Sequence, residues 1–499
     1  MSKYIINPAY FLKNDKNRVI ITKRDYVEKY IEDTYDLHDV FSFIHPLNAQ
    51  MLSFFNGEDD LEMITQKTSA YFQIAENEMY NILLKYIENK KSFAIIYDDT
   101  KIVIPQNMVI RKSDHIKKYN TYNPESFICT EKPDFETVRL NSPMNILFLP
   151  TMQCYTDCIY CYANRKMNSS GNMTLQQIQS IINQAKEIEV ENIDLNGGEV
   201  LLHPYYKEII TMLLENNYYP SISTKIPLSE KIIDDLKSIG ISSIQISLDS
   251  VNPNTLTQLL KVKETYLESM AHTLQYLCKK EFKVKIHSIV TSYNSDLEEF
   301  INLINWLSKY SCVYHIQISP AGYSLYKTNF LQYRTSETFM NTLSSYIDNI
   351  REKFSRISFQ VSGGNFKKDY EDKISIFNKR ALCSGNVRSL VILPDGRVTV
   401  CEELYENEQF IIGDLTKQTI MEIWNSPKAN DLFYINPDTI SDDSVCKKCV
   451  TFDSCRQGLG VCWKEILMAY GENNWDYPDA RCPKAPEMYN DICMDAFSK

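Results

Sequence analysis

The 499-residue sequence lacks any apolar run of the ~18–20 residues that a helix needs to cross a bilayer. Its opening stretch, MSKYIINPAYFLKN, does not show the basic, apolar and small-residue order of a secretory signal. It also lacks an excess of positive charge, because 53 Lys and Arg stand against 64 Asp and Glu, a net charge of −11. We therefore expect a cytoplasmic protein that binds neither membranes nor nucleic acid, since nucleic-acid binding usually leaves a basic surface.

No internal repeat of solenoid period is visible, and the length favours roughly two to four domains. The most informative feature is the set of 14 cysteines. In a small exported protein they would indicate disulfides, but here three lie within 154–161 and eight follow residue 380. Short cysteine spacings in an intracellular chain are typical of metal ligands.

The first region, 1–105, predicts two hairpins that flank three short helices, which is a winged-helix-like pattern. The hairpins are expected at 10–22, turning at Asn14-Asp15, and at 92–105, turning at Asp98-Asp99; the helices are expected from His45 to Gly57, over 59–69 and over 76–90. The following segment, 106–142, is polar and contains Pro124 and Pro133, so we expect a linker.

The second region, 143–345, alternates short apolar strands with amphipathic helices. The strands are expected at 145–150, 192–196, 220–224, 242–249, 283–291 and 314–320, with helices such as 175–189 and 229–239 between them. Repeated β/α units give parallel strands with helices outside, and ligands collect at the carboxyl ends of such strands. The third region, 346–499, is loop-rich, and bound metal can supply its folding free energy.

A closely spaced cysteine triplet, Cys154, Cys158 and Cys161, follows the first strand of the second region. Thiolates hold iron–sulfur clusters, and three ligands on a four-iron cluster leave one iron open. The alternatives are a zinc knuckle or three free cysteines. Zinc normally takes four ligands, and the closest downstream histidine is His203.

In its context this CxxxCxxC triplet resembles the motif of the radical S-adenosylmethionine (SAM) superfamily. The resemblance implies an α/β fold with an incomplete (β/α)6 barrel, and a [4Fe–4S] cluster whose open iron binds SAM. It also implies that the reduced cluster cleaves SAM to a deoxyadenosyl radical, which abstracts a hydrogen atom. It implies a SAM contact by Tyr160, directly before the third cysteine, and further contacts from the GGE, STK and SLD segments by Gly197, Gly198, Glu199, Thr224, Ser247 and Asp249. Val200 departs from the proline that usually follows GGE.

The C-terminal cysteines resemble those of the SPASM domain, which binds two auxiliary [4Fe–4S] clusters. The resemblance implies that the outer cluster is held by Cys446, Cys449, Cys455 and Cys482, and the inner one by Cys383, Cys401 and Cys462. Six residues separate Cys455 from Cys462, where the family has three, and a fourth inner cysteine is missing. Either another residue such as Cys493 completes the inner cluster, or one iron stays open for substrate, which we favour. A structural zinc domain is the alternative.

Four further residues carry separate expectations. Cys278 and Cys312 are expected to be buried small apolar residues, and Cys129 has no assigned role. Glu402 follows Cys401, where related sulfatase-maturing enzymes carry a catalytic proton acceptor. We favour a solvated carboxylate at Glu402.

The N-terminal pattern resembles the recognition element of ribosomal peptide maturation systems. The resemblance implies that a precursor's leader adds as an extra strand along Arg18–Thr22, with a DNA-binding winged helix as the alternative. We therefore expect a radical SAM maturase of a ribosomal peptide, reduced by a flavodoxin- or ferredoxin-type donor.

The expected reaction is an oxidative cross-link, foremost a cysteine thioether as in sactipeptide and ranthipeptide synthases. Carbon–carbon cross-linking, another peptide oxidation and maturation of a folded protein are alternatives. A non-catalytic electron carrier or DNA-binding redox sensor is the alternative from another class.

Overall fold

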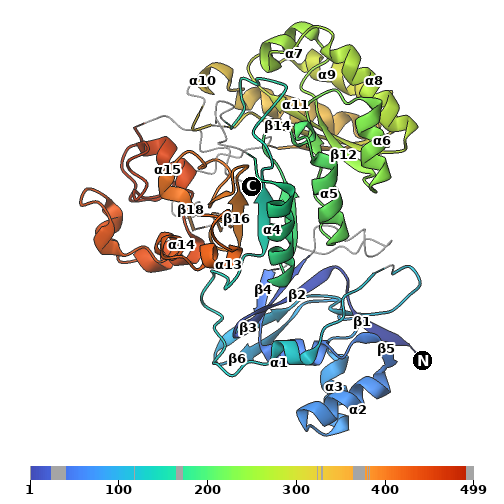
Figure 1. Cartoon of the computed structure of the whole chain (residues 1–499), viewed down its shortest axis with the longest axis vertical. Coiled ribbons are helices and arrows are strands. Elements are labelled where there is room, and N and C mark those ends of the chain that lie inside the picture. The colour runs from blue at the N-terminus through green and yellow to red at the C-terminus, as the bar shows by residue number, and fades with distance from the viewer. Residues whose placement is uncertain are drawn as a thin grey trace. The chain divides into compact units, whose positions relative to one another are not determined.

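The computed structural model describes residues 2–23, 41–116, 118–163, 172–322, 324–326, 330–362, 377–378, 380 and 382–489 (Figure 1). The chain divides into two compact units, Met1–Ser142 and Pro143–Lys499. Within the described ranges, no helix has the length and apolar character needed to span a membrane.

The N-terminal unit consists of small antiparallel sheets and three helices. One sheet has the order β5-β1-β8, a second has the order β2-β3-β4, and β6 and β7 form a hairpin. The bounds are β1 Lys3–Ile6, β2 Tyr10–Asp15, β3 Arg18–Lys23, β4 Phe41–Ile44, α1 Pro46–Leu52, β5 Asn56–Asp60, α2 Leu61–Phe72, α3 Glu76–Leu84, β6 Phe93–Tyr97, β7 Thr100–Ile104 and β8 Val109–Arg111.

Both predicted hairpins and all three predicted helices are present, but the first turn was misplaced. Asn14 and Asp15 pair with Val19 and Arg18, so the turn falls at Lys16-Asn17, where Lys16 has a φ of 66°. The second hairpin turns at Asp98-Asp99 as predicted, and both residues have positive φ.

Two predictions for this unit are wrong. Arg18–Thr22 is not a free edge, because β3 pairs with β2 on one side and with β4 on the other. The expected linker 106–142 packs into the unit: its β8 pairs with β1, and Phe127 is buried in the core. The buried Arg18 guanidinium also donates to the carbonyls of Asp134 and Arg139, each at 3.0 Å, which ties this segment down.

The second unit contains two five-stranded sheets, ordered β10-β9-β16-β17-β18 and β11-β12-β13-β14-β15. All six predicted strands are confirmed, and neighbours among them pair in parallel where they are hydrogen-bonded. Their bounds are β9 Asn145–Phe148, β10 Asn192–Leu195, β11 Ser223–Thr224, β12 Ser243–Ser247, β13 Lys283–Val290 and β14 Val313–Pro320. The α/β fold with an incomplete barrel is thus confirmed, and the described strands form open sheets.

Strands from beyond residue 345 complete these sheets. β15 (Ser358–Val361) pairs with β14, and β16 (Ser389–Ile392) pairs with β9, both in parallel; β17 (Arg397–Thr399) and β18 (Ile411–Asp414) follow antiparallel. The carboxyl-terminal part therefore shares a sheet with the first strand of the β/α region.

Helices pack on the sheets of this unit, because each helix has apolar residues on one face and these residues share a core with the buried side chains of the strands. The helices are α4 Leu175–Glu187, α5 Tyr206–Glu215, α6 Glu230–Ser238, α7 Pro253–Leu260, α8 Tyr266–Lys279, α9 Leu297–Leu307, α10 Phe330–Tyr333, α11 Glu337–Ile350, α13 Ile420–Trp424, α14 Pro427–Phe433 and α15 Trp463–Tyr470. Figure 1 shows α6, α8 and α9 outside strands β12 and β14. The predicted helices at 175–189 and 229–239 are α4, with a Thr174 capping box, and α6, capped by Ser229.

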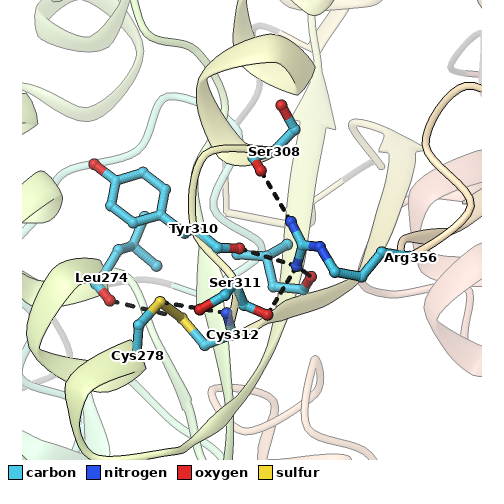
Figure 2. Close-up of a disulfide and its surroundings, with 8 residues drawn as sticks. Leu274, Cys278, Ser308, Tyr310, Ser311, Cys312 and Arg356 are labelled. Carbon is cyan, nitrogen blue, oxygen red and sulfur yellow. Dashed lines mark hydrogen bonds between the residues drawn. A yellow bond between two sulfur atoms is a disulfide. The ribbon is translucent and has the colours of Figure 1, made fainter.

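Cys278 and Cys312 are not the buried small apolar residues that the sequence predicted, because both are half-buried and they form a disulfide (Figure 2). Cys278 lies in the last turn of α8 and Cys312 immediately before β14, 34 residues apart in sequence. The same loop is held from its other side by Arg356, whose guanidinium donates to the carbonyls of Ser308, Tyr310, Ser311 and Val313 at 2.8–3.1 Å.

Candidate functional site

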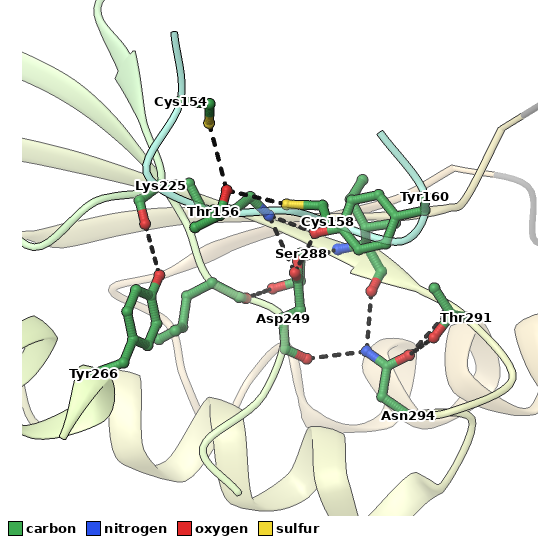
Figure 3. Close-up of polar contacts among 12 residues, drawn as sticks. Cys154, Thr156, Cys158, Tyr160, Lys225, Asp249, Tyr266, Ser288, Thr291 and Asn294 are labelled. Carbon is green, nitrogen blue, oxygen red and sulfur yellow. Dashed lines mark hydrogen bonds and ion pairs between the residues drawn. The ribbon is translucent and has the colours of Figure 1, made fainter. Parts of the chain in front are cut away.

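The cysteine triplet lies in the loop that follows β9. Cys158 is buried, and Cys154 and Cys161 are half-buried. The Thr156 hydroxyl oxygen lies 3.5 Å from the Cys154 sulfur and 3.2 Å from the Cys158 sulfur (Figure 3). Burial raises the pKa of the Cys158 thiol to about 11. Because metal binding requires the thiolate, a bound cluster would displace this proton.

Two glycines allow β10 to approach the cysteine loop. A Cβ atom at Gly197 would overlap with the carbonyl oxygen of Thr151, and one at Gly198 with the carbonyl oxygen of Gln153. Instead, Gly198 N donates to Thr151 O at 2.9 Å and Glu199 N donates to Gln153 O at 2.6 Å. The predicted GGE segment therefore lies directly beside the cysteine loop.

Glu199 presents a buried carboxylate next to this loop. Its side chain accepts hydrogen bonds from the Thr224 hydroxyl at 2.8 Å and from the Lys225 backbone N–H at 3.1 Å. Burial raises the pKa of Glu199 to about 7, although these hydrogen bonds oppose the shift. A buried carboxylate of this kind is suited to bind an ammonium group.

Asp249 lies at the centre of a polar network (Figure 3). One carboxylate oxygen accepts hydrogen bonds from the Tyr160 hydroxyl and, at 3.0 Å, from Lys225 Nζ; the other accepts from Ile289 N at 2.9 Å. Lys225 Nζ also donates to the Tyr160 hydroxyl at 2.5 Å. The Lys225 side chain links the cysteine loop to Asp249, and the sequence prediction did not include it.

The pKa of Lys225 shows how strongly this network is coupled. Burial opposes the charged ammonium, but the neighbouring Asp249 carboxylate outweighs burial, so the pKa of Lys225 is raised. Burial and Asp249 likewise hold the Tyr160 hydroxyl pKa well above its usual range. In the sequence, Lys225 could have been recognised as a site residue from its position directly after strand β11, next to the predicted SAM contact Thr224.

Ser247 ends β12, in register with His287 of β13. Burial, with Lys225 nearby, lowers the pKa of His287 to about 4, so its imidazole is neutral at physiological pH. The described residues thus place every predicted SAM contact either on the cysteine loop or at the carboxyl end of a strand.

The expectation that Glu402 is a solvated carboxylate is wrong. One of its oxygens accepts hydrogen bonds from Asn196 Nδ2 at 2.6 Å and from the Tyr162 hydroxyl at 3.3 Å. Burial and the neighbouring Glu403 raise the pKa of Glu402. Tyr162 follows Cys161 and Asn196 precedes Gly197, so Glu402 borders the site built by the triplet and the GGE segment.

The three inner cysteines come together although they are far apart in sequence. A Cβ atom at Gly385 would overlap with the carbonyl oxygen of Val400, which brings the Cys383 and Cys401 segments into contact. Burial holds the pKa of Cys462 well above its usual range, and the charges of Cys383 and Cys401 raise it further.

The four outer cysteines, Cys446, Cys449, Cys455 and Cys482, also lie close enough together to affect one another's pKa. Burial raises the pKa of Cys482, and the thiols of Cys446, Cys455 and Cys449 raise it further. Two buried arginines donate to sulfur atoms of this group: Arg380 to Cys455 at 3.2 Å and Arg456 to Cys446 at 3.4 Å.

The positive charges of Arg380 and Arg456 suit the binding of an anionic group at the outer cysteines. In the described residues, the other polar contacts of Arg380 and Arg456 are to backbone carbonyls, and neither has a carboxylate partner. Buried cations need negative partners, and a cluster with four thiolate ligands is negatively charged. No group of three or more His, Cys, Asp or Glu in the described ranges has the arrangement expected for a single metal ion.

Two known families match the chain in the regions that build these sites. The Radical SAM superfamily matches residues 148–307, and the iron–sulfur cluster-binding SPASM domain matches residues 383–450. The chain therefore contains a radical SAM domain and an iron–sulfur cluster-binding SPASM domain, and these domains imply SAM and [4Fe–4S] clusters as cofactors.

Individual relatives match over smaller or more divergent stretches. A probable GTP 3′,8-cyclase of Methanococcus vannielii is 29% identical over 111 residues, which are 22% of this chain and 37% of that protein. The probable GTP 3′,8-cyclase of Archaeoglobus fulgidus is 26% identical over 167 residues, 32% of this chain and 55% of that protein. The chain thus spans between about a third and about a half of the length of these curated relatives.

Among solved structures, Streptococcus suis SuiB bound to its precursor peptide SuiA matches with a TM-score of 0.62 and 14% identity, covering 97% of this chain and 100% of that chain. SuiB bound to S-adenosylmethionine matches with a TM-score of 0.59 and 14% identity, covering 96% and 100%. At this identity the similarity establishes the fold, including that of the N-terminal unit.

If Glu199 binds the amino group of SAM, the binding of SAM is expected to weaken as the pH falls through about 7, because the Glu199 carboxylate then gains a proton and becomes a weaker acceptor. The pKa is raised, so the carboxylate is present above this pH and lost below it, by about tenfold in affinity per pH unit. Anaerobic binding titrations would measure this profile. Glu199→Gln should bind weakly with little pH dependence, and a flat wild-type profile would contradict this role.

Removing a buried cation beside the outer cysteines should make the associated cluster harder to reduce. Arg456→Gln is expected to lower its midpoint potential by about tens of millivolts, as measured in a redox titration followed by electron paramagnetic resonance (EPR). Lys448→Gln is the control, because it makes the same charge change at an exposed residue beside Cys449. Equal shifts in both variants would show that the Arg456–sulfur contact has no specific effect.

Proposed function

We propose that this protein binds the leader of a ribosomally made precursor peptide and oxidatively cross-links the peptide, with a cysteine thioether as the foremost product. The observation that carries this proposal is the combination of two units in one chain. One unit has the triplet, GGE and SPASM cysteines of a radical SAM enzyme, and the other has hairpins and helices of a winged-helix-like type. The fold similarity to SuiB, solved with its precursor peptide, supports it.

In this proposal, Cys154, Cys158 and Cys161 hold the cluster that binds SAM. Glu199 binds the amino group of SAM, and the remaining contacts are made by Tyr160, Gly197, Gly198, Thr224, Ser247 and Asp249. When bound, the reduced cluster and SAM supply a radical that removes a hydrogen atom from an unactivated carbon. The buried Glu199 and Asp249 side chains keep water away from the reacting groups.

Forming a thioether releases a second electron and the proton of the attacking thiol. Glu402 would accept this proton, since its carboxylate borders the triplet and its pKa is raised. The inner cysteines (Cys383, Cys401, Cys462) and the outer ones (Cys446, Cys449, Cys455, Cys482) would hold two auxiliary [4Fe–4S] clusters, whose role is to take electrons.

The leader would add to an edge strand of the N-terminal unit. β3 is paired on both sides, so Arg18–Thr22 does not offer this edge. A leader peptide that runs along the edge of another strand of this unit would gain main-chain hydrogen bonds there.

A direct test uses the full-length reconstituted enzyme, SAM, a reductant and synthetic peptides for the short reading frames beside its gene. We expect one peptide to become about 2 Da lighter per cross-link, and its cysteine to resist alkylation, which would identify a thioether. Tandem mass spectrometry would locate the bond. A flavodoxin or ferredoxin should replace the chemical reductant.

Two controls separate the parts of this proposal. The same peptide without its leader half should be modified poorly while SAM is still cleaved. Modification with the cysteine still alkylatable would instead indicate a carbon–carbon link or another oxidation. If SAM is cleaved but no such peptide changes mass, or if the leader is dispensable, the proposed function is wrong.

A further inference from the structure

The inner cysteine site has a buried carboxylate next to it that no hydrogen bond satisfies. Glu465 lies three residues after Cys462, and only 2% of its surface is exposed. Among the described residues, neither of its carboxylate oxygens has a hydrogen-bond partner. Buried polar groups are almost always paired, so an orphaned buried carboxylate indicates a missing positive partner.

Helix geometry directs Glu465 toward the cysteine. Cys462 is the N-cap of α15 and Glu465 is its third residue, the two positions that face each other across the first turn of a helix. Helices α4 and α13 begin with capping boxes, in which the side chain of the third residue, Gln177 or Glu422, accepts a hydrogen bond from the backbone N–H of the N-cap residue. Glu465 makes no such bond, because the Cys462 N–H donates to Asp479 at 3.3 Å.

The nearby cations are already paired with other carboxylates. Lys464 Nζ lies 2.6 Å from Glu403, and Arg481 lies 2.7 Å from Asp479. Burial raises the pKa of Glu465 to about 7, as expected for a carboxylate without a close positive partner.

We propose that Glu465 is the fourth protein ligand of the inner auxiliary cluster held by Cys383, Cys401 and Cys462. This inference rests on the proposed presence of that cluster. A carboxylate oxygen is an established ligand type for iron. Glu465 would complete the cluster where the fourth cysteine of the family pattern is missing.

This assignment changes the expected role of the inner cluster. With four protein ligands, the cluster has no iron permanently open for a peptide thiolate, and it acts as an electron acceptor. Of the two alternatives that the cysteine spacing leaves open, it favours a cluster completed by another protein residue, Glu465; Cys493 lies outside the described residues.

The test uses full-length protein in which Cys154, Cys158 and Cys161 are changed to Ala, so that auxiliary clusters alone remain. This background should hold about eight irons. A cluster with an open iron loses that iron on mild oxidation and gives the EPR signal of a three-iron cluster. We expect the background to keep its iron, and the added Glu465→Gln change to release about one iron with that signal.

Two further variants make the result specific. Glu465→Cys should restore resistance to oxidation, because a thiolate replaces the carboxylate. Glu422→Gln, a change at an exposed residue in the same helix position of α13, should behave like the background. Iron loss from the background itself, or no loss after Glu465→Gln, would overturn the assignment. A background with about four irons, unchanged by Cys383→Ala, would instead show that the inner cluster is absent.

Discussion

The candidate site depends on the close packing of two backbones, the loop after β9 and the segment after β10. At Gly197 and Gly198 the chain passes so near to the carbonyls of Thr151 and Gln153 that no Cβ atom fits. This contact places Glu199 beside the cysteine triplet. A larger residue at either glycine would push the loop away and separate the cysteine triplet from the Glu199 carboxylate.

Side-chain charges distinguish the sites from one another. Two carboxylates with raised pKa values, the half-buried Glu402 and the buried Glu465, lie beside the triplet and the inner cysteines. Buried arginines, Arg380 and Arg456, instead donate to the outer cysteines. Since a reduced cluster carries more negative charge, neighbouring cations favour its reduction and neighbouring carboxylates oppose it. The outer cysteines thus have arginines bonded to their sulfur atoms, whereas the triplet and the inner cysteines have both carboxylates and cations nearby, among them Lys225 and Arg388.

Local patterns predicted the strands and the triplet because both are encoded in short stretches. The alternation of apolar residues identified β9 to β14, and the position of Asp249 at the end of a strand placed it in the site. Pairing partners are not local, so the internal position of β3 and the packing of 106–142 were missed. The Cys278–Cys312 disulfide and the contacts of Lys225 also join segments that only the folded chain brings together.

If Cys154, Cys158 and Cys161 hold the cluster that cleaves SAM, the enzyme must lose SAM cleavage when all three are changed to Ala. The yield of 5′-deoxyadenosine from the reconstituted protein, with SAM and dithionite, measures this loss. We expect the yield to fall to background while about two thirds of the iron remains bound at the SPASM cysteines. An undiminished yield would contradict the assignment of the triplet.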